Sequence, residues 1–183
     1  MIAMEAISAV YTANGIVVPA LNEANSLYQD GYGSLVRDSR VLSLQPFEAL
    51  YLVERQKVSI IEEQTKNRLV FRELLQRFSE DDPDIWTRYI VYRDLRTRGF
   101  VAKGGKGPGL DFLVYERGSY GKKVPRYMVY TVWEGSKVPV ARLGKVLDEA
   151  TSSDTILRLA VVDRRGELVY YTLSDMDFDE RED

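Results

Sequence analysis

The 183-residue sequence contains no cysteine and no histidine. The absence of cysteine excludes disulfides and thiolate metal sites. The absence of histidine removes the side chain that most often transfers protons near neutral pH and most often binds metals. No apolar run approaches the roughly 18 residues of a membrane span, and the start of the chain lacks the basic and apolar regions of a secretion signal. We therefore expect a cytoplasmic protein that uses no metal, no cofactor and no membrane.

Charge of both signs is present, and it is unevenly distributed. The net charge is -3, yet residues 86–108 hold six bases and one acid, whereas residues 175–183 hold six acids and one base. A positive face on a mildly acidic protein suits a polyanion or an acidic protein partner. Two ordinary solvated surfaces explain the charge alone equally well.

The first part of the chain predicts a small α+β domain over residues 1–82. Asn14-Gly15 separates the apolar runs 4–11 and 15–18, which is typical of a β-hairpin. Asn22 can cap a short helix, and Ser43 can cap a second one that has Pro46 in its first turn. A strand over 58–61 and a helix over 68–80 complete this part.

The second part predicts an α/β domain over residues 83–183. Asp82 and Pro83 start a helix over 85–98, and Gly99 ends it. We expect five strands and one further helix at 100–103, 110–115, 126–133, 140–150 (the helix), 156–162 and 167–173. One helix layered on a mixed five-stranded sheet places the whole chain in the α/β class.

A long motif lies across the helix, loop and strand over residues 89–115, which read YIVYRDLRTRGFVAKGGKGPGLDFLVY. It resembles the archaeal-type tRNA-splicing endonucleases, whose helix ends in YxDLRxRG and is followed by a K-x-G-x-K-x-G loop and DFLVY. The first part resembles the N-terminal domain of that family through a Gly-Tyr-Gly turn and a Leu-Ser…Glu-Ala-x-Tyr-Leu run. The matching residues are Gly31, Gly33, Leu42, Ser43, Glu48, Ala49, Tyr51, Leu52, Tyr92, Asp94, Leu95, Arg96, Arg98, Gly99, Lys103, Gly105, Lys106, Gly109 and 111–115. The resemblance implies a restriction-endonuclease-like fold for the second domain.

The resemblance also implies a metal-independent RNA cleavage that leaves 2′,3′-cyclic phosphate and 5′-hydroxyl ends. A tyrosine removes a proton, a histidine protonates the leaving oxygen, and a lysine neutralises the phosphate. The tyrosine position is Tyr115. Val124 stands at the histidine position, and Thr155 stands near the lysine position just before the strand at 156–162. Losing a general acid typically costs ~10²–10⁴ in rate, so we expect no cleavage by this chain alone.

The resemblance therefore implies the non-catalytic, structural subunit of a heterotetramer with two copies each of this chain and a catalytic chain, acting on precursor tRNA. We expect RNA contacts from the basic residues Arg96, Arg98, Lys103, Lys106, Lys122 and Lys123. We expect subunit contacts from the last strand and the loop before it, through Asp163, Arg164, Arg165, Glu167, Leu168, Tyr170, Tyr171 and Leu173. In the family that loop is acidic, whereas Arg164 and Arg165 make it largely basic here, so the same docking contact is in question.

Three alternatives stay open from the sequence. An autonomous ribonuclease would use Tyr115 with Lys122 and Lys123, although an unperturbed lysine, with a pKa near ~10.4, is a poor acid at neutral pH. A plain RNA-binding module would bind RNA without a partner subunit. A metal-dependent nuclease would use Asp111 with residues 134–137, but the Glu-x-Lys spacing is one residue too long. The loop at 103–109 lacks the residue order of a nucleotide-binding phosphate loop.

Overall fold

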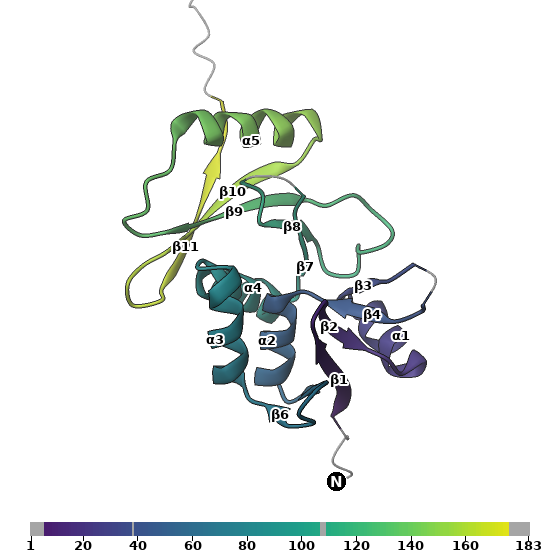
Figure 1. Cartoon of the computed structure of the whole chain (residues 1–183). Helices are drawn as coiled ribbons and strands as arrows, with labels where there is room; N and C mark the ends of the chain where they lie inside the picture. The colour runs from purple at the N-terminus through teal and green to yellow at the C-terminus, as the bar shows by residue number, and fades with distance from the viewer. Residues whose placement is uncertain (1–5, 38, 107–108, 176–183) are drawn as a thin grey trace, which may run out of the picture. The chain divides into compact units, whose positions relative to one another are not determined.

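The computed structural model describes residues 6–37, 39–106 and 109–175, and Figure 1 shows the order of its elements. These residues form five α-helices and two mixed sheets, which confirms the α/β class. The chain divides into two compact units, residues 1–103 and 104–183. The acidic tail beyond Asp175 and part of the 103–109 loop lie outside the described residues. No helix of the described residues is long and apolar enough to cross a bilayer.

The first unit is built on a six-stranded sheet in the order β3-β4-β2-β1-β5-β6. The bounds of its strands are β1 Ile7–Thr12, β2 Gly15–Val18, β3 Ser34–Leu35, β4 Leu42–Leu44, β5 Val58–Glu62 and β6 Arg68–Leu69. The hairpin predicted around Asn14-Gly15 is confirmed, since β1 and β2 pair antiparallel with Thr12 opposite Gly15. β1 also pairs in parallel with β5, so its apolar residues meet partners on both sides.

Four helices belong to the first unit: α1 Leu21–Gln29, α2 Pro46–Glu54, α3 Phe71–Asp81 and α4 Ile85–Thr97. Three predicted caps are wrong. Asp82 is the C-cap of α3, and the N-cap of α4 is Asp84. Asn22 lies inside α1, whose N-cap is Ala20, and Ser43 lies in β4, so Gln45 is the N-cap of α2. α4 contacts α2 and α3 and buries Tyr89 and Tyr92 completely. The structure therefore divides after Lys103, and the sequence-based boundary after residue 82 stays a prediction.

The second unit contains helix α5 and the strands of the five-stranded sheet β11-β10-β9-β8-β7 except β7, which spans the division after Lys103. The bounds are β7 Val101–Gly104, β8 Phe112–Tyr115, β9 Tyr127–Trp133, α5 Val140–Ser152, β10 Ile156–Val162 and β11 Leu168–Leu173. β9 and β10 are parallel, and β8–β9 and β10–β11 are antiparallel.

Helix α5 joins the two parallel strands and covers one face of the sheet (Figure 1). Its buried Val146 and Ala150 pack in one cluster with Met128, Tyr130 and Leu157. A parallel pair needs such a crossover connection. Because β9 and β10 are parallel, with Tyr127 opposite Ile156, their starts lie at the same edge of the sheet. The end of β8, which runs the other way, lies at that edge as well.

Candidate functional site

The register of three strands brings the Tyr115 and Thr155 positions to one edge of the second sheet. Val114 on β8 lies opposite Tyr127 on β9, and Tyr127 lies opposite Ile156 on β10. One residue further out, Arg126 continues both ladders: its N–H donates to the Val114 carbonyl at 2.8 Å, and its carbonyl accepts from the Ile156 N–H at 3.1 Å. Tyr115, Arg126 and Thr155 therefore stand side by side on neighbouring strands, which are spaced by about 4.8 Å.

This edge carries little of the chemistry that the resemblance would place there. Tyr115 is half-buried, and its ring makes an edge-to-face contact with Tyr120, with centroids 5.1 Å apart. Val124 is 75% exposed and has no group that transfers a proton. The hydroxyl of Thr155 donates to the Ala150 carbonyl at 3.1 Å, so it closes the end of α5. Of the three positions that the resemblance predicts, Tyr115 alone has the expected side chain, and a catalytic site at this edge stays a prediction.

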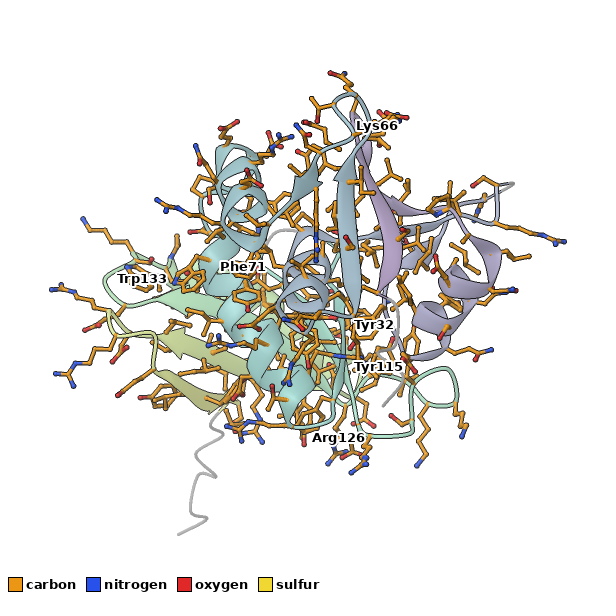
Figure 2. The ribbon with its side chains drawn as sticks, turned by 90° about the horizontal axis from the view of Figure 1, so that it is seen from below. Tyr32, Lys66, Phe71, Tyr115, Arg126 and Trp133 are labelled. Atoms are coloured by element: carbon orange, nitrogen blue, oxygen red, sulfur yellow. The ribbon has the colours of Figure 1, made fainter. Side chains whose placement is uncertain are left out.

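The loop between β8 and β9 presents cations beside this edge. Ser119 is buried and organises the loop: its hydroxyl and N–H both bond the Glu116 carbonyl, and its own carbonyl accepts the N–H groups of Lys122 and Lys123. The side chains of Lys122 and Lys123 are exposed, as is that of Arg126. Figure 2 shows Tyr115 and Arg126 in the second unit.

A second group of motif residues meets in the first unit, around a buried ion pair. The Glu48 side chain is 1% exposed, and its carboxylate accepts the N–H of Gly33 at 2.9 Å and of Gln45 at 2.8 Å. The Lys103 ammonium lies 3.7 Å from Glu48 Oε1. The same ammonium donates to the carbonyls of Gly31 at 3.2 Å and Gly33 at 2.5 Å. These contacts give Lys103 a structural role, and an additional RNA contact of Lys103 stays a prediction.

Glycine is required at position 33 for this arrangement. Gly33 has φ +63°, and a Cβ there would come within 2.6 Å of the Ser43 carbonyl oxygen and 2.7 Å of the Leu42 side chain. Any residue with a side chain is disfavoured at this position, both by the positive φ and by these close contacts. The turn can therefore pass close enough to α2 and β7 for its backbone to reach Glu48 and Lys103.

Burial is the largest cause of the pKa shifts of Glu48 and Lys103. Desolvation raises the pKa of Glu48, although Lys103 and the two N–H donors oppose that shift. Desolvation lowers the pKa of Lys103, and Glu48 opposes that shift. Both groups are thus held in a site that resists charge, so each depends on the other to stay ionised.

Arg96 and Arg98 take different places at the end of α4. The Arg96 guanidinium lies 4.0 Å from the centroid of the Tyr32 ring and donates to the Asp30 carbonyl at 2.9 Å. Arg98 is exposed and donates to Asp94 at 2.8 Å. Arg96 and Lys103 therefore both hold the Gly-Tyr-Gly turn: Arg96 contacts Tyr32 and Asp30, and Lys103 contacts the carbonyls of Gly31 and Gly33. Lys106 is exposed in the loop that follows β7.

The residues of the metal-dependent alternative make other contacts. The Asp111 carboxylate accepts the N–H of Thr131 at 2.7 Å and its hydroxyl at 2.8 Å. Glu134 accepts the N–H of Arg164 at 3.1 Å. Within residues 6–37, 39–106 and 109–175, no group of three or more acidic side chains is placed to hold a metal ion. The described geometry therefore offers no support for that alternative.

The predicted subunit contacts lie at the last strand and the loop before it. β11 ends the strand order of the sheet, and within the part of the chain that the structure describes it pairs with β10 alone. Val169 and Tyr171 on this strand are 50% and 55% exposed. Leu168, Tyr170 and Leu173 are half-buried in the same strand. An exposed apolar edge strand needs a cover of some kind.

The loop before β11 is held rigidly by its own acids. One oxygen of Asp163 accepts the N–H groups of Arg165 and Glu167, each at 2.8 Å. Since Glu134 accepts the N–H of Arg164, two carboxylates bond the loop backbone, and the side chains of both arginines are exposed. Arg164 and Arg165 therefore extend to solvent from a hydrogen-bonded loop whose net charge, with Asp163 and Glu167, is zero.

Two contributors to these sites were absent from the sequence-based predictions. Arg126 is one, and its place follows only from the register of three strands. Glu48 is the other: it matches the family pattern, but nothing near it in sequence indicates a buried cation partner.

Both parts of the chain match known protein families. The N-terminal domain of tRNA intron endonuclease matches residues 8–75, and the catalytic C-terminal domain of tRNA intron endonuclease matches residues 85–170. The tRNA-splicing endonuclease of Methanococcus maripaludis is 32% identical over 158 residues, which cover 86% of this chain and 88% of the relative. An EndA-like protein of Methanopyrus kandleri is 34% identical over 167 residues, covering 84% and 88% of the two chains.

A relative of a different length also matches. The tRNA-splicing endonuclease of Methanococcoides burtonii is 34% identical over 149 residues, which cover 80% of this chain and 40% of that protein. Both domain matches, in the expected order, and near full-length similarity to the other two relatives lead to one conclusion. The chain belongs to the tRNA intron endonuclease family.

Proposed function

We propose that this chain is a non-catalytic, structural subunit of a tRNA-splicing endonuclease, assembled as two copies with two copies of a catalytic chain of the same fold. The assembly excises introns from precursor tRNA and leaves 2′,3′-cyclic phosphate and 5′-hydroxyl ends. One observation supports the non-catalytic role above all others. Val124 and Thr155 stand at or near the two sequence positions where the resemblance predicts the histidine and the lysine, and only Tyr115 keeps the expected side chain.

The side chains at these positions that can donate or accept a proton are too few for this chain to cut RNA alone. In-line attack by the 2′-hydroxyl needs a base, an acid for the leaving oxygen and a cation for the phosphate. Tyr115 can offer a hydroxyl with an unperturbed pKa of about 10. Neither valine nor threonine protonates a leaving group. Losing the acid alone removes ~10²–10⁴ of rate, so scaffolding and RNA binding remain as the roles of this chain.

Two surfaces suit the proposed partner. β11 is the end strand of the sheet that the structure describes, and with Val169 and Tyr171 exposed it offers a strand edge and apolar area to another chain. A symmetric tail-to-tail pairing of two such edges would close both sheets. The rigid loop with Arg164 and Arg165 offers positive charge, which fits an acidic surface on the catalytic chain or a phosphate of the RNA. A cytoplasmic location, where tRNA is processed, stays part of this proposal.

Purified proteins separate this function from its alternatives. Intron-containing precursor tRNA is incubated with this chain, with the catalytic partner, and with both. We expect cleavage only by the mixture, and a stable complex of the two chains on size-exclusion chromatography. Cleavage by this chain alone would establish the autonomous ribonuclease instead. RNA binding with no partner complex would leave the plain RNA-binding module.

A further inference from the structure

The edge formed by β8, β9 and β10 contains an exposed arginine, Arg126, whose backbone continues both strand ladders. Both backbone groups of Arg126 are fixed, one by Val114 and one by Ile156. Its side chain is exposed and forms no ion pair with the residues that the structure describes. Arg158 of the same unit, by contrast, has partners: its guanidinium donates to the Thr172 hydroxyl and lies 5.3 Å from the Tyr127 ring centroid. An exposed guanidinium carried by a backbone that is fixed in this way is suited to bind an external anion.

The charge around Arg126 favours an anion. The segment between Tyr115 and Tyr127 holds four cations and one acid, and the cations are Arg117, Lys122, Lys123 and Arg126. Gly118 and Gly121, with φ of +74° and +77°, let this loop turn twice within a short length. The hydrogen bonds of Ser119 then hold the turns together. The cations are therefore presented by a folded loop rather than by a random tail.

The aromatic residues beside these cations favour a nucleic acid over an acidic protein. Tyr115 and Tyr120 are both half-buried, so part of each ring reaches solvent, and their edge-to-face contact fixes the two rings relative to each other. Tyrosine rings accept stacked bases, and neighbouring cations bind the phosphates that link them. A purely acidic peptide would use the cations and leave the rings without a role.

We propose that this edge is a binding site for a single RNA strand, in which the Arg126 guanidinium holds one phosphodiester and Tyr120 stacks on an adjacent base. The site binds the strand without cutting it. The proposal adds a specific RNA contact to the proposed structural subunit and rests on that function only for the identity of the natural RNA. The residues and geometry that support it belong to this chain alone.

The test measures RNA affinity of the full chain by fluorescence anisotropy. The probes are a labelled single-stranded RNA of about 8 nucleotides and a labelled intron-containing precursor tRNA. Arg126→Ala is compared with Arg142→Ala, which removes another exposed arginine of the same unit, on α5. We expect Arg126→Ala to weaken binding about 3- to 10-fold and to reduce the slope of log affinity against log salt by ~0.7, the value for one phosphate of a single strand. Arg142→Ala should change neither quantity.

Two further variants identify the chemistry of the site. Arg126→Lys should keep the salt slope and recover part of the affinity, since it retains the charge and loses the bidentate geometry. Tyr120→Leu should weaken binding about tenfold with no change in slope, since stacking is uncharged. Circular dichroism should show an unchanged fold for all variants.

Two results would overturn the proposal. The first is equal affinity and equal salt slope for Arg126→Ala and Arg142→Ala. The second is unchanged RNA binding with weakened capture of the catalytic partner, which would make this edge a protein contact. Failure of the proposed function looks different: the lone chain cleaves precursor tRNA, or no partner complex forms, whatever the effect of Arg126→Ala on affinity.

Discussion

The buried pair of Glu48 and Lys103 gives the sharpest quantitative prediction, through the substitution Lys103→Met. Methionine keeps most of the volume and removes the charge. The Glu48 carboxylate, 1% exposed, then keeps its two N–H donors and the more weakly acting Arg96 but loses the ammonium beside it, and the Gly31 and Gly33 carbonyls lose their ammonium donor. Breaking a buried ion pair in this way costs about 3–5 kcal/mol. Because the Lys103 side chain keeps 19% exposure, we expect the lower end, about 3 kcal/mol.

The pH dependence of this loss follows from the Glu48 carboxyl. Burial already raises its pKa above 4.5, and the charge of Lys103 opposes that rise, so Lys103→Met raises it further. A carboxyl whose pKa is higher in the folded state than in the unfolded state destabilises the fold progressively as pH rises above the unfolded value. The deficit of Lys103→Met should therefore be largest near about pH 8 and shrink toward about pH 5. The part due to the two carbonyls should not change with pH.

Urea denaturation can follow the first unit by itself. The chain has two tryptophans, and Trp133→Phe leaves Trp86, which lies on α4, as the only one. In that background, Lys103→Met should lower the urea midpoint by about 1–3 M, since slopes of about 1–3 kcal/mol per M are usual. Lys106→Met, an exposed lysine three residues away, should change stability by less than about 0.5 kcal/mol. A deficit below about 1 kcal/mol that is equal at both pH values would refute the argument.

Three further predictions test the proposed role and the division of the chain. Tyr115→Phe should leave cleavage by the assembled enzyme within about twofold, because this tyrosine has no acid partner, and a loss of ~10²-fold would make it a working base. Val124→His combined with Thr155→Lys should restore precursor tRNA cleavage to this chain in complexes whose catalytic partner has lost its histidine, by at least ~10²-fold over the unsubstituted chain in gel assays. No gain would mean that the strand register does not align the three positions. A fragment over residues 1–103 should give a cooperative thermal transition, whereas a fragment over 1–82 should not, because it lacks α4; equal transitions would contradict the packing division.

The periodicity of the sequence predicts the second sheet well because its strands are buried on both faces or alternate cleanly. The run 156–162 is apolar except for Arg158, and β10 has those bounds. The helix predicted over 68–80 begins too early, because Arg68 and Leu69 pair with Ile61 and Ile60 on β5. The apolar spacing fits a helix there, but the preceding strand, β5, pairs with those two residues in an antiparallel hairpin. Strand pairing thus overrides the helical spacing.

The candidate sites could be predicted only in part, for a similar reason. Residue types and spacing locate Tyr115, Val124 and Thr155, since each lies beside a strand that the sequence predicts. The role of Lys103 could not be predicted: a lysine in a glycine-rich loop resembles a solvent-exposed phosphate contact. Its partner Glu48 lies 55 positions earlier, and only the folded chain brings them together. Buried ion pairs across such separations leave no periodic signal.

The separation between Glu48 and Lys103 has a consequence during synthesis. Ribosomes add about 5–20 residues per second, so Lys103 follows Glu48 by ~3–11 s. During that interval the nascent chain cannot bury Glu48 as an anion, and the Gly-Tyr-Gly turn has no ammonium to close around. The first unit can therefore complete this ion pair only after Lys103, which lies within the motif at residues 89–115, has been translated.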